Sequence, residues 1–314
     1  MHFVARVGGS GLIPRAGLVF LGVFGPLAAG CSPRSHSQVV EDSLTSGRIT
    51  LVSAKEARGM MARERDAFQA LYPQARIEIE GGTSRDAIGR LFGGTSDLAV
   101  VTRELAPEER AAAARGRIDL EGFRFARDAL LAVVNQNNRV ENLTLADLES
   151  IYEGRATHWS EFGGDGERIV PVVQRQDSDV TQFFIQRVMG GGPIAAQSVT
   201  ADSDSGVVAE VAARAGAIGF VSLGASLDGA RALRLASLRG LPYRDADLER
   251  VYEGQYPLTR FFSLYVRGSS RPAANGFITY VTSIDGQRLV QQSGFVPTAV
   301  PVRFVRRSAM RGAH

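Results

Sequence analysis

The stretch RITLVSAKEARGMMARERDAFQALYPQARIEIE, residues 48–80, decides the fold. Its opening part, RITLVSA, is rich in β-branched and apolar side chains, which is typical of a buried strand. Met61 and Phe68 follow at helical spacing, and Pro73 stands just beyond the point where that helix would end. The closing part, RIEIE, alternates between charged and apolar side chains, as a strand does. We therefore predict the order strand, helix, strand over this stretch.

The same alternation continues toward the C-terminus in two series. The first goes on through a helix at SRDAIGRLF and a buried strand at residues 97–102. The second comprises strands at residues 128–135, 168–174, 217–223 and 256–268, helices at residues 144–154 and after Asp179, and one long final helix over residues 275–297. Strands that alternate with helices predict an α/β fold in which mostly parallel sheets carry helices on both faces. Two such series favour two sheets with a ligand between them.

The letters GGTS occur twice, at residues 81–84 and 93–96, and mark opposite ends of one predicted helix. The first copy follows a strand, so Ser84 is a candidate for the N-cap of that helix. The second copy follows IGRLF, where Gly93 or Gly94 can close the helix in a left-handed turn. The two copies are therefore not a structural repeat.

The N-terminal segment has the layout of a secretory signal. Arg6 and Arg15 precede the apolar run AGLVFLGVFGPLAAG, and the segment holds no acidic residue. The run is shorter than the ~20 residues that a membrane-spanning helix needs, and Pro26 interrupts it. A positive start, a short apolar centre and small residues at the exit predict a signal peptide over residues 1–30.

The chain's only cysteine, Cys31, comes directly after LAAG. A small buried thiol is one alternative, because a lone cysteine cannot form an internal disulfide. Its position resembles instead a bacterial lipoprotein lipobox, although Ala28 stands where leucine is usual, and simple secretion is the second alternative. We expect Cys31 to be lipidated, so that acyl chains tether the protein to a membrane that it does not cross. Residues 31–46 are polar and predict a flexible tether.

The charge balance gives no reason to expect a nucleic-acid partner. The whole chain has a formal net charge of +3, with 36 basic and 33 acidic residues. Removal of the signal takes away Arg6 and Arg15, which leaves 34 basic residues against 33 acidic ones and a net charge of +1. A domain so close to neutral lacks the basic excess that nucleic-acid binding proteins carry.

Signatures of enzymes and of metal sites are missing from the sequence. The histidines at positions 2, 36, 158 and 314 are scattered, and no pair has the spacing of metal ligands. The chain has no glycine-rich loop that ends in Gly-Lys-Ser and no nucleophile elbow. We therefore expect no catalysis, no metal and no cofactor.

Three strand-to-helix junctions offer hydroxyl or backbone N–H groups beside a basic side chain. They are SAKEAR at residues 53–58, GGTSRD at 81–86 and RQDSDVT at 175–181. The N-terminus of a helix attracts anions because its first N–H groups lack partners and the helix dipole is positive there. The plain alternative is that the hydroxyl side chains of these junctions only cap helices. Three junctions in one doubly wound pattern favour a converging anion site at the carboxyl ends of the strands.

Four longer segments carry a resemblance to a known family. They are LTLADLESIYEGRATHWSEFGG (143–164), DSGVVAEVAARAGAIGFVSLG (204–224), YPLTRFFSLYVRG (256–268) and FITYVTSIDGQRLVQQSGFVP (277–297). They resemble the phosphate-binding proteins of bacterial phosphate ABC importers, and the likeness extends from about Gly47 to Pro297. It implies a two-lobed periplasmic-binding-protein fold of the type II kind, with hinge strands between the lobes and one anion buried in the cleft.

The resemblance also implies which residues would hold the anion. The fourth loop of the family reads Arg-x-x-Gly-Ser-Gly-Thr, and here Asp179 and Val180 stand in place of its Ser-Gly. In the first loop, Lys55 and Glu56 stand where the family has threonine and an apolar residue. The oxyanion site expected from the matching positions consists of Ser53, Lys55, Ser84, Thr102, Arg103, Arg175, Asp179 and Thr181.

Asp179 leaves two interpretations open. Its carboxylate can accept the proton of monohydrogen phosphate, which would favour phosphate over sulfate. Alternatively it caps the helix and points at N–H groups that would otherwise hold ligand oxygens. In the second case Asp179→Ser strengthens anion binding, and phosphate binding by the natural chain is weak or absent.

Together with the predicted lipid anchor, the resemblance implies a lipid-anchored, extracytoplasmic solute-binding protein. Its lobes are expected at residues 47–126 with 245–314, and at residues 127–244, with about 300–314 as a disordered tail. The expected partners are inorganic phosphate or a similar oxyanion, an ABC permease, and a membrane through the lipid anchor alone; the chain is expected to be a monomer. The alternative is a member of the family that has lost tight phosphate binding and serves as a sensor, a scaffold or a binder of another ligand.

Overall fold

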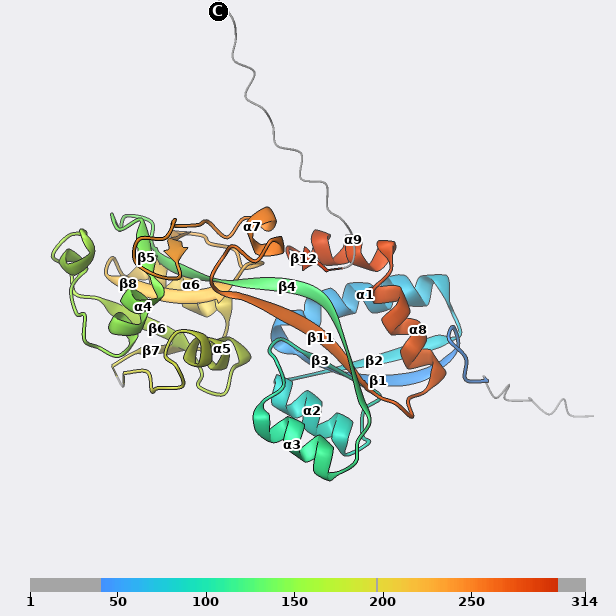
Figure 1. Cartoon of the computed structure of the whole chain (residues 1–314). Coiled ribbons are helices and arrows are strands. Elements are labelled where there is room, and N and C mark those ends of the chain that lie inside the picture. Colours follow the sequence, from blue (N-terminus) through green and yellow to red (C-terminus); the bar gives the residue numbers. More distant parts are fainter. Residues whose placement is uncertain (1–40, 196, 299–314) are drawn as a thin grey trace, which may run out of the picture. The chain divides into compact units, whose positions relative to one another are not determined.

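The computed structural model describes residues 41–195 and 197–298 (Figure 1). The strands are β1 (Gly47–Ala54), β2 (Ala75–Gly82), β3 (Leu98–Val101), β4 (Leu120–Asn135), β5 (Asn142–Thr144), β6 (Val170–Gln174), β7 (Val199–Ala201), β8 (Ala217–Ser222), β9 (Ala230–Ala232), β10 (Arg234–Ala236), β11 (Thr259–Arg267) and β12 (Val296–Pro297). The α-helices are α1 (Arg58–Leu71), α2 (Ser84–Phe92), α3 (Pro107–Arg115), α4 (Leu145–Tyr152), α5 (Asp179–Arg187), α6 (Asp204–Ala213), α7 (Leu248–Tyr252), α8 (Pro272–Val281) and α9 (Ile284–Gln292), and two short 3₁₀ helices are η1 (Lys55–Ala57) and η2 (Trp159–Phe162).

The main sheet has the strand order β2-β1-β3-β11-β4-β8-β6-β7 within the described residues. β1 runs parallel to β2 and β3, as the opening stretch of sequence predicts, and β6 runs parallel to β7 and β8. The strands β4 and β11 run antiparallel to each other in the middle of the row. The fold is therefore α/β with two parallel groups of strands joined by an antiparallel pair.

The first lobe is the group of β1, β2 and β3 with the helices that cover it. Alternate residues of β1 face opposite sides: Leu51 packs with Met61 of α1 and with α8, whereas Val52 packs with Ile88 of α2. Phe68 of α1 meets Phe277 of α8 edge to face, with ring centroids 5.5 Å apart. Helices thus cover both faces of this sheet, α1 and α8 on one side and α2 on the other (Figure 1).

The second lobe is the group of β6, β7 and β8 with α4, α5 and α6. Phe220 of β8 stacks on Phe184 of α5 with ring centroids 4.1 Å apart, and Tyr152 of α4 packs against both rings. The other face of β8 turns Val221 toward the cluster that includes Val207 of α6. Each lobe therefore has its own buried core and helices on both faces of its sheet.

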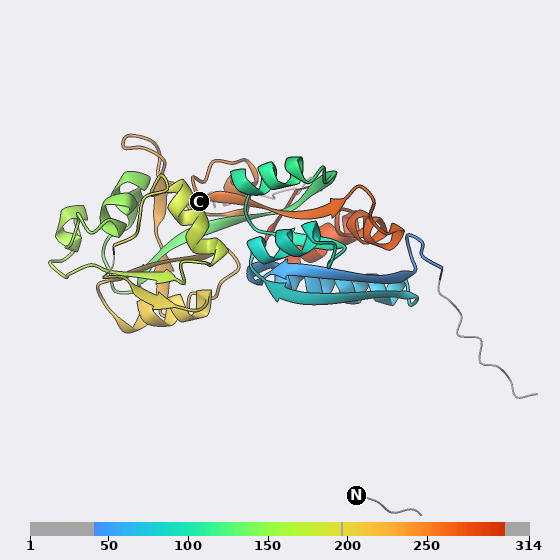
Figure 2. The same ribbon diagram turned by 90° about the horizontal axis from the view of Figure 1, so that it is seen from below.

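β4 belongs to both lobes. Its residues from Leu120 to Ala129 pair with β11, and those from Leu130 to Val134 pair with β8. Figure 2 shows β4 and β11 running side by side between the lobes. β11 leads back from the second lobe to the first. Leu258, just before β11, packs in the core of the second lobe, and Phe262 of β11 packs in that of the first. The predicted lobe boundaries themselves stay a prediction.

Two local expectations are wrong. The long final helix is divided into α8 and α9, because Ser283 caps the start of α9 by accepting a hydrogen bond from Gly286 N. The N-cap of α2 is Thr83 rather than Ser84, since Thr83 and Asp86 form a reciprocal capping box. Ser84 is consequently the first residue inside α2. At the other end, Gly94 has a φ of 71° and makes the expected left-handed turn.

The last residues of the predicted tether are described and lie against the first lobe. Ser43 and Ser46 pair across a turn. The carbonyl oxygen of Leu44 lies so close to Gly276 of α8 that a Cβ atom at that position would be only 1.7 Å from it. The expected lipidation site Cys31, the predicted signal and the predicted C-terminal tail lie outside the described residues. Among the helices that the structure describes, none has the length and apolar character to cross a membrane.

Candidate functional site

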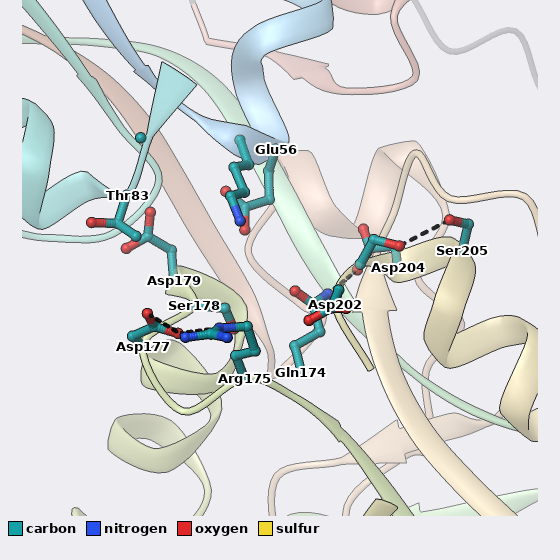
Figure 3. Close-up of a pocket in the computed structure, with 13 residues that line it drawn as sticks. Glu56, Thr83, Gln174, Arg175, Asp177, Ser178, Asp179, Asp202, Asp204 and Ser205 are labelled. Carbon is teal, nitrogen blue, oxygen red and sulfur yellow. Dashed lines mark hydrogen bonds and ion pairs between the residues drawn. The ribbon is translucent and has the colours of Figure 1, made fainter. Parts of the chain in front are cut away.

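The carboxyl ends of β1, β2, β6 and β7 open onto one cavity of about 280 Å³ (Figure 3). Its lining residues are Lys55, Glu56, Gly82, Thr83, Gln174, Arg175, Asp177, Ser178, Asp179, Asp202, Ser203, Asp204 and Ser205. They come from the last residues of these strands and from the segments that follow them, two strands from each lobe. Parallel strands place the loops at their carboxyl ends together, and this is where open α/β sheets bind ligands.

Asp179 of the second lobe reaches a set of donors in the first. Its Oδ2 accepts hydrogen bonds from Ser84 N at 2.8 Å and Ser84 Oγ at 2.7 Å, and Thr102 Oγ1 lies 3.3 Å away. Its Oδ1 lies 3.6 Å from Arg103 Nε. Asp179 is only 4% exposed. Four residues of the predicted oxyanion site therefore meet, but one of them is itself the anion that the other three hold.

Ser84 can serve this contact because Thr83 takes over the capping of α2. The N–H group of Ser84 lies in the first turn of α2, where backbone donors lack helical partners. A carboxylate at this position is stabilised both by the hydrogen bonds and by the positive end of the helix dipole. Ser84 Oγ also accepts a hydrogen bond from Thr102 N at 3.0 Å, which fixes the hydroxyl in position. The N-terminus of α2 is thus arranged to hold an anionic oxygen.

Asp179 does not cap its own helix. Ser178 is the N-cap of α5 and accepts a hydrogen bond from Thr181 N at 3.2 Å. The interpretation that Asp179 caps its own helix is therefore wrong, since Asp179 accepts from the N-terminus of α2 and not from that of α5. Arg103, for its part, donates to both carboxylate oxygens of Glu109, at 2.9 and 2.7 Å. The guanidinium of Arg103 is shared between two carboxylates.

The remaining predicted residues divide into two pairs. Lys55 and Arg175 line the cavity, and Arg175 forms an exposed ion pair with Asp177 at 3.1 Å. Ser53 and Thr181 do not line the cavity: Ser53 Oγ donates to Ala54 O, and Thr181 Oγ1 donates to Gln174 O. Both hydroxyls are buried and occupied by the backbone.

Sequence reasoning missed a fourth junction, between β7 and α6. There Asp202 and Asp204 flank Ser203, the N-cap of α6, and Asp204 accepts from Gln174 Nε2 at 2.6 Å and Ser222 N at 3.3 Å. The available signal was a short strand followed by DSDSG, a pattern of the same kind as the other junctions. With only three residues, β7 is too short to stand out by periodicity.

A buried ion pair lies beside the cavity. Arg260 of β11 donates through Nε to Asp128 of β4 at 2.9 Å and through Nη2 to Ser222 Oγ at 2.8 Å. The side chains of Arg260 and Asp128 are 1% and 0% exposed. Because Asp128 and Arg260 lie on the two strands that cross between the lobes, their pair ties these strands together at the level of the cavity.

Two carboxyl groups of the cavity wall have raised pKa values. Burial raises the pKa of Glu56 to about 7; Arg260 opposes this rise, and Asp179 and Asp204 add to it. Burial likewise raises the pKa of Asp204 to about 6, with Asp128 adding to the rise and Arg260 opposing it. Both groups therefore titrate close to neutral pH. No cluster of His, Cys, Asp and Glu with metal-site geometry occurs in the part of the chain that the structure describes.

Comparison with known proteins agrees with this architecture. The PBP superfamily domain matches residues 40–285. The phosphate-binding protein PstS of Bacillus subtilis (strain 168) is 24% identical over 287 residues, which cover 89% of this chain and 92% of the relative. PstS of Pseudomonas aeruginosa (strain PAO1) is 22% identical and is covered to 93%.

Solved structures show the same fold. An ABC-type phosphate transport receptor from Vibrio cholerae superposes with a TM-score of 0.70 at 24% identity, over 79% of this chain and 99% of the receptor. The two-lobed arrangement with a cleft at the strand ends, predicted from the sequence, is thereby confirmed. The chain belongs to the PBP superfamily, and its fold is that of the substrate-binding proteins of phosphate ABC transporters.

Proposed function

We propose that this protein is an extracytoplasmic solute-binding protein that delivers phosphate or a related oxyanion to an ABC importer. Its relatives over nearly the whole chain are named as phosphate-binding proteins. The observation that carries the proposal is the contact at the start of α2, where Ser84, Thr102 and Arg103 already surround an anionic carboxylate. The same donors suit an oxygen of a bound oxyanion.

Asp179 competes with such a ligand. Its Oδ2 lies within hydrogen-bonding distance of three donors, so it has little capacity left to accept a proton from a ligand. An incoming oxyanion takes over the donors of Ser84 and displaces the carboxylate, while Lys55 and Arg175 on the cavity wall offset its charge. This displacement lowers the net affinity for the oxyanion, because breaking the contact of Asp179 with Ser84 costs free energy.

Delivery requires the lobes to open and close around the cleft. β4 and β11 are the connections that cross between the two cores, and we assign the hinge to them, close to residues 128–135 and just before β11. In this proposal, residues 47–126 with 245–314 and residues 127–244 move as the two bodies. The Asp179–Ser84 contact joins them across the cleft when no solute is bound.

The location of the protein belongs to the same proposal. Residues 1–30 act as a signal, Cys31 carries the lipid, and the polar segment that follows links it to the folded part. Cys31→Ser should move the protein from the membrane fraction to the soluble fraction of the cell envelope. An unchanged membrane fraction for the variant would reject the anchor without touching the binding function.

A second candidate function is supported by the cavity's own charge. Its acidic lining residues Glu56, Asp177, Asp179, Asp202 and Asp204 outnumber its basic ones, Lys55 and Arg175. This balance favours a member of the superfamily that has lost tight binding of inorganic phosphate. Such a protein would serve as a binder of another solute or as a sensor.

Calorimetric titration separates these candidates. The folded domain, the Asp179→Ser variant and the Arg175→Ala variant are each titrated with phosphate and with sulfate. We expect weak or no binding to the natural chain and a gain of about ten- to a hundredfold for both anions in Asp179→Ser, which removes the competing charge. Adding Arg175→Ala to that variant should weaken binding, because a charge-assisted hydrogen bond is lost. No heat with either anion in any variant would reject the oxyanion function.

A further inference from the structure

Glu56 and Asp204 form a wall of the cavity that has no cation of its own. Glu56 Oε2 is shielded from solvent and accepts no hydrogen bond within the described part of the chain. Asp204 is held by the neutral donors Gln174 Nε2 and Ser222 N, and no described cation lies within 4.0 Å of it. A buried carboxylate without a counter-charge is unfavourable, so the ionised form of this wall is stabilised either by a proton or by a positively charged partner that enters the cavity.

Arg260 meets that need only in part, since its Nη1 is buried without a hydrogen-bond partner among the described residues and forms no ion pair with Glu56 or Asp204. Arg260 is near enough to oppose the pKa rise of Glu56 and Asp204, but its ion pair is with Asp128, at 2.7 Å. Arg260 is also absent from the residues that line the cavity. The remaining charged groups that act on Glu56 are Asp179 and Asp204, which are themselves acidic.

The lining also selects among cations. It contains no aromatic residue, whereas quaternary ammonium groups are recognised by aromatic faces. A primary ammonium group carries three N–H donors, which match the carboxyl groups of Glu56 and Asp204, both residues of the cavity lining. Metal ions fit less well, since the described residues provide no cluster of metal ligands here. The chemistry of this wall therefore favours a primary amine.

A second part of the cavity wall carries the complementary charge. Lys55 is exposed and lines the cavity, and the exposed Arg175 lines it from the second lobe. We propose that the cavity contains an ammonium subsite at Glu56 and Asp204, so that its solute is a small oxyanion that also bears a primary amine. This inference rests on the proposed solute-binding function and specifies the chemical class of the solute.

The test compares a phosphate ester that carries a primary amine with one that does not. The folded domain is titrated at pH 8 with 2-aminoethyl phosphate, with ethyl phosphate, and with ethanolamine, which carries the amine without the phosphate. We expect 2-aminoethyl phosphate to bind about tenfold or more tighter than ethyl phosphate, since it adds a charge-assisted contact. Choline phosphate should show no such advantage, because its ammonium group has no N–H donor.

Glu56→Gln identifies the subsite. The variant keeps the shape of the side chain and removes its charge, and it should abolish most of the advantage of 2-aminoethyl phosphate over ethyl phosphate. Glu78 of β2 forms an exposed ion pair with Arg48 of β1, so Glu78→Gln is the matched control and should leave the ratio unchanged. Lowering the pH from 8 to 5 should also reduce the ratio in the natural chain, because Glu56 and Asp204 take up protons over this range.

The outcomes distinguish this inference from the proposed function. Equal affinities for 2-aminoethyl phosphate and ethyl phosphate, or an advantage that survives Glu56→Gln, would overturn the ammonium subsite and leave oxyanion binding intact. No binding of any amine probe would overturn it as well. Binding of ethanolamine without any binding of the phosphate esters would retain the subsite and reject the oxyanion function.

Discussion

Two buried carboxyl groups in different regions of this molecule have opposite surroundings. Asp128, in the strand that crosses between the lobes, is 0% exposed and pairs with Arg260. Glu64, in α1 of the first lobe, is also 0% exposed, but neither of its oxygens has a hydrogen-bond partner among the described residues. Burial raises the pKa of Glu64 to about 9, so this group is protonated at neutral pH. Equal burial therefore has different consequences, which the partners decide.

The same contrast recurs within the cleft. Asp179 has three donors within hydrogen-bonding distance and ties two segments together, whereas Glu56 has an oxygen without any donor. A satisfied carboxylate holds the structure in one arrangement, whereas an unsatisfied one takes up a proton, as Glu64 does, or meets a ligand where it lines a cavity, as Glu56 does. The charge of a residue thus says little about its role until its partners are counted.

The largest effect should come from breaking the buried ion pair of Asp128 and Arg260. Asp128→Ala leaves the guanidinium of Arg260 buried and unpaired, which should lower the free energy of unfolding by about 3–5 kcal/mol in a denaturant titration. Asp165→Ala is the matched control, because the Asp165–Arg139 pair is exposed; it should change the stability by at most ~1 kcal/mol. Equal losses in the two variants would show that burial does not strengthen the pair.

Replacing the unsatisfied carboxyl should act in the opposite direction. Glu64→Met keeps a similar volume and should raise the free energy of unfolding at pH 7 by about 3 kcal/mol, because the folded chain must hold a proton that the unfolded chain has released. The folded pKa is the higher one, so the natural chain loses stability as the pH rises from about 4.5 to about 9. The advantage of Glu64→Met should therefore shrink at pH 4. An advantage that does not vary with pH would contradict the protonated state.

Removing the donor at the cleft should have an intermediate effect. Ser84→Ala deletes the hydroxyl that donates to Asp179 and accepts from Thr102 N, and it should lower the free energy of unfolding by about 1–3 kcal/mol. Ser293→Ala is the control, since Ser293 Oγ is shielded and has no partner among the described residues. If Ser84→Ala were as harmless as the control in thermal unfolding, the bridge between the lobes would contribute nothing to stability.

The smallest effect is expected at the exposed pair of the cavity rim. Arg175 and Asp177 have side chains that are 60% and 64% exposed. Arg175→Ala should change the free energy of unfolding of the ligand-free protein by less than ~1 kcal/mol, because an exposed ion pair gains little in water. A loss comparable to that of Asp128→Ala would show that Arg175 is tied into the fold.

Much of the fold could be predicted because it follows from local pattern. The stretch from Arg48 to Glu80 alternates in a way that only a strand, a helix and a second strand satisfy, and β1, α1 and β2 occupy it. The division between α8 and α9 was missed because apolar spacing continues across it. The Ser283 cap that ends the pattern is visible only as one polar residue in the sequence.

The site was predictable in its residues but not in their pairing. Ser84, Thr102, Arg103 and Asp179 could be proposed from their places at helix and strand ends, yet Ser84 and Asp179 are 95 residues apart along the chain. Local pattern cannot say that one candidate ligand residue would occupy the donors of another. Glu64 shows the same limit, since it stands in the charged run RERD and nothing there marks it as buried.

With the lipid on Cys31 that we propose, the contact of Leu44 with Gly276 limits how far the folded part can stand from a membrane. It places the last packed point of the N-terminal segment 13 residues after Cys31 (44 minus 31). A fully extended chain gains at most ~3.5 Å per residue, so this segment reaches at most ~45 Å, close to the thickness of one bilayer with its headgroups. A lipid on Cys31 would therefore keep the cleft within a thin layer above the membrane. Solute captured there would reach an importer by lateral diffusion along the surface.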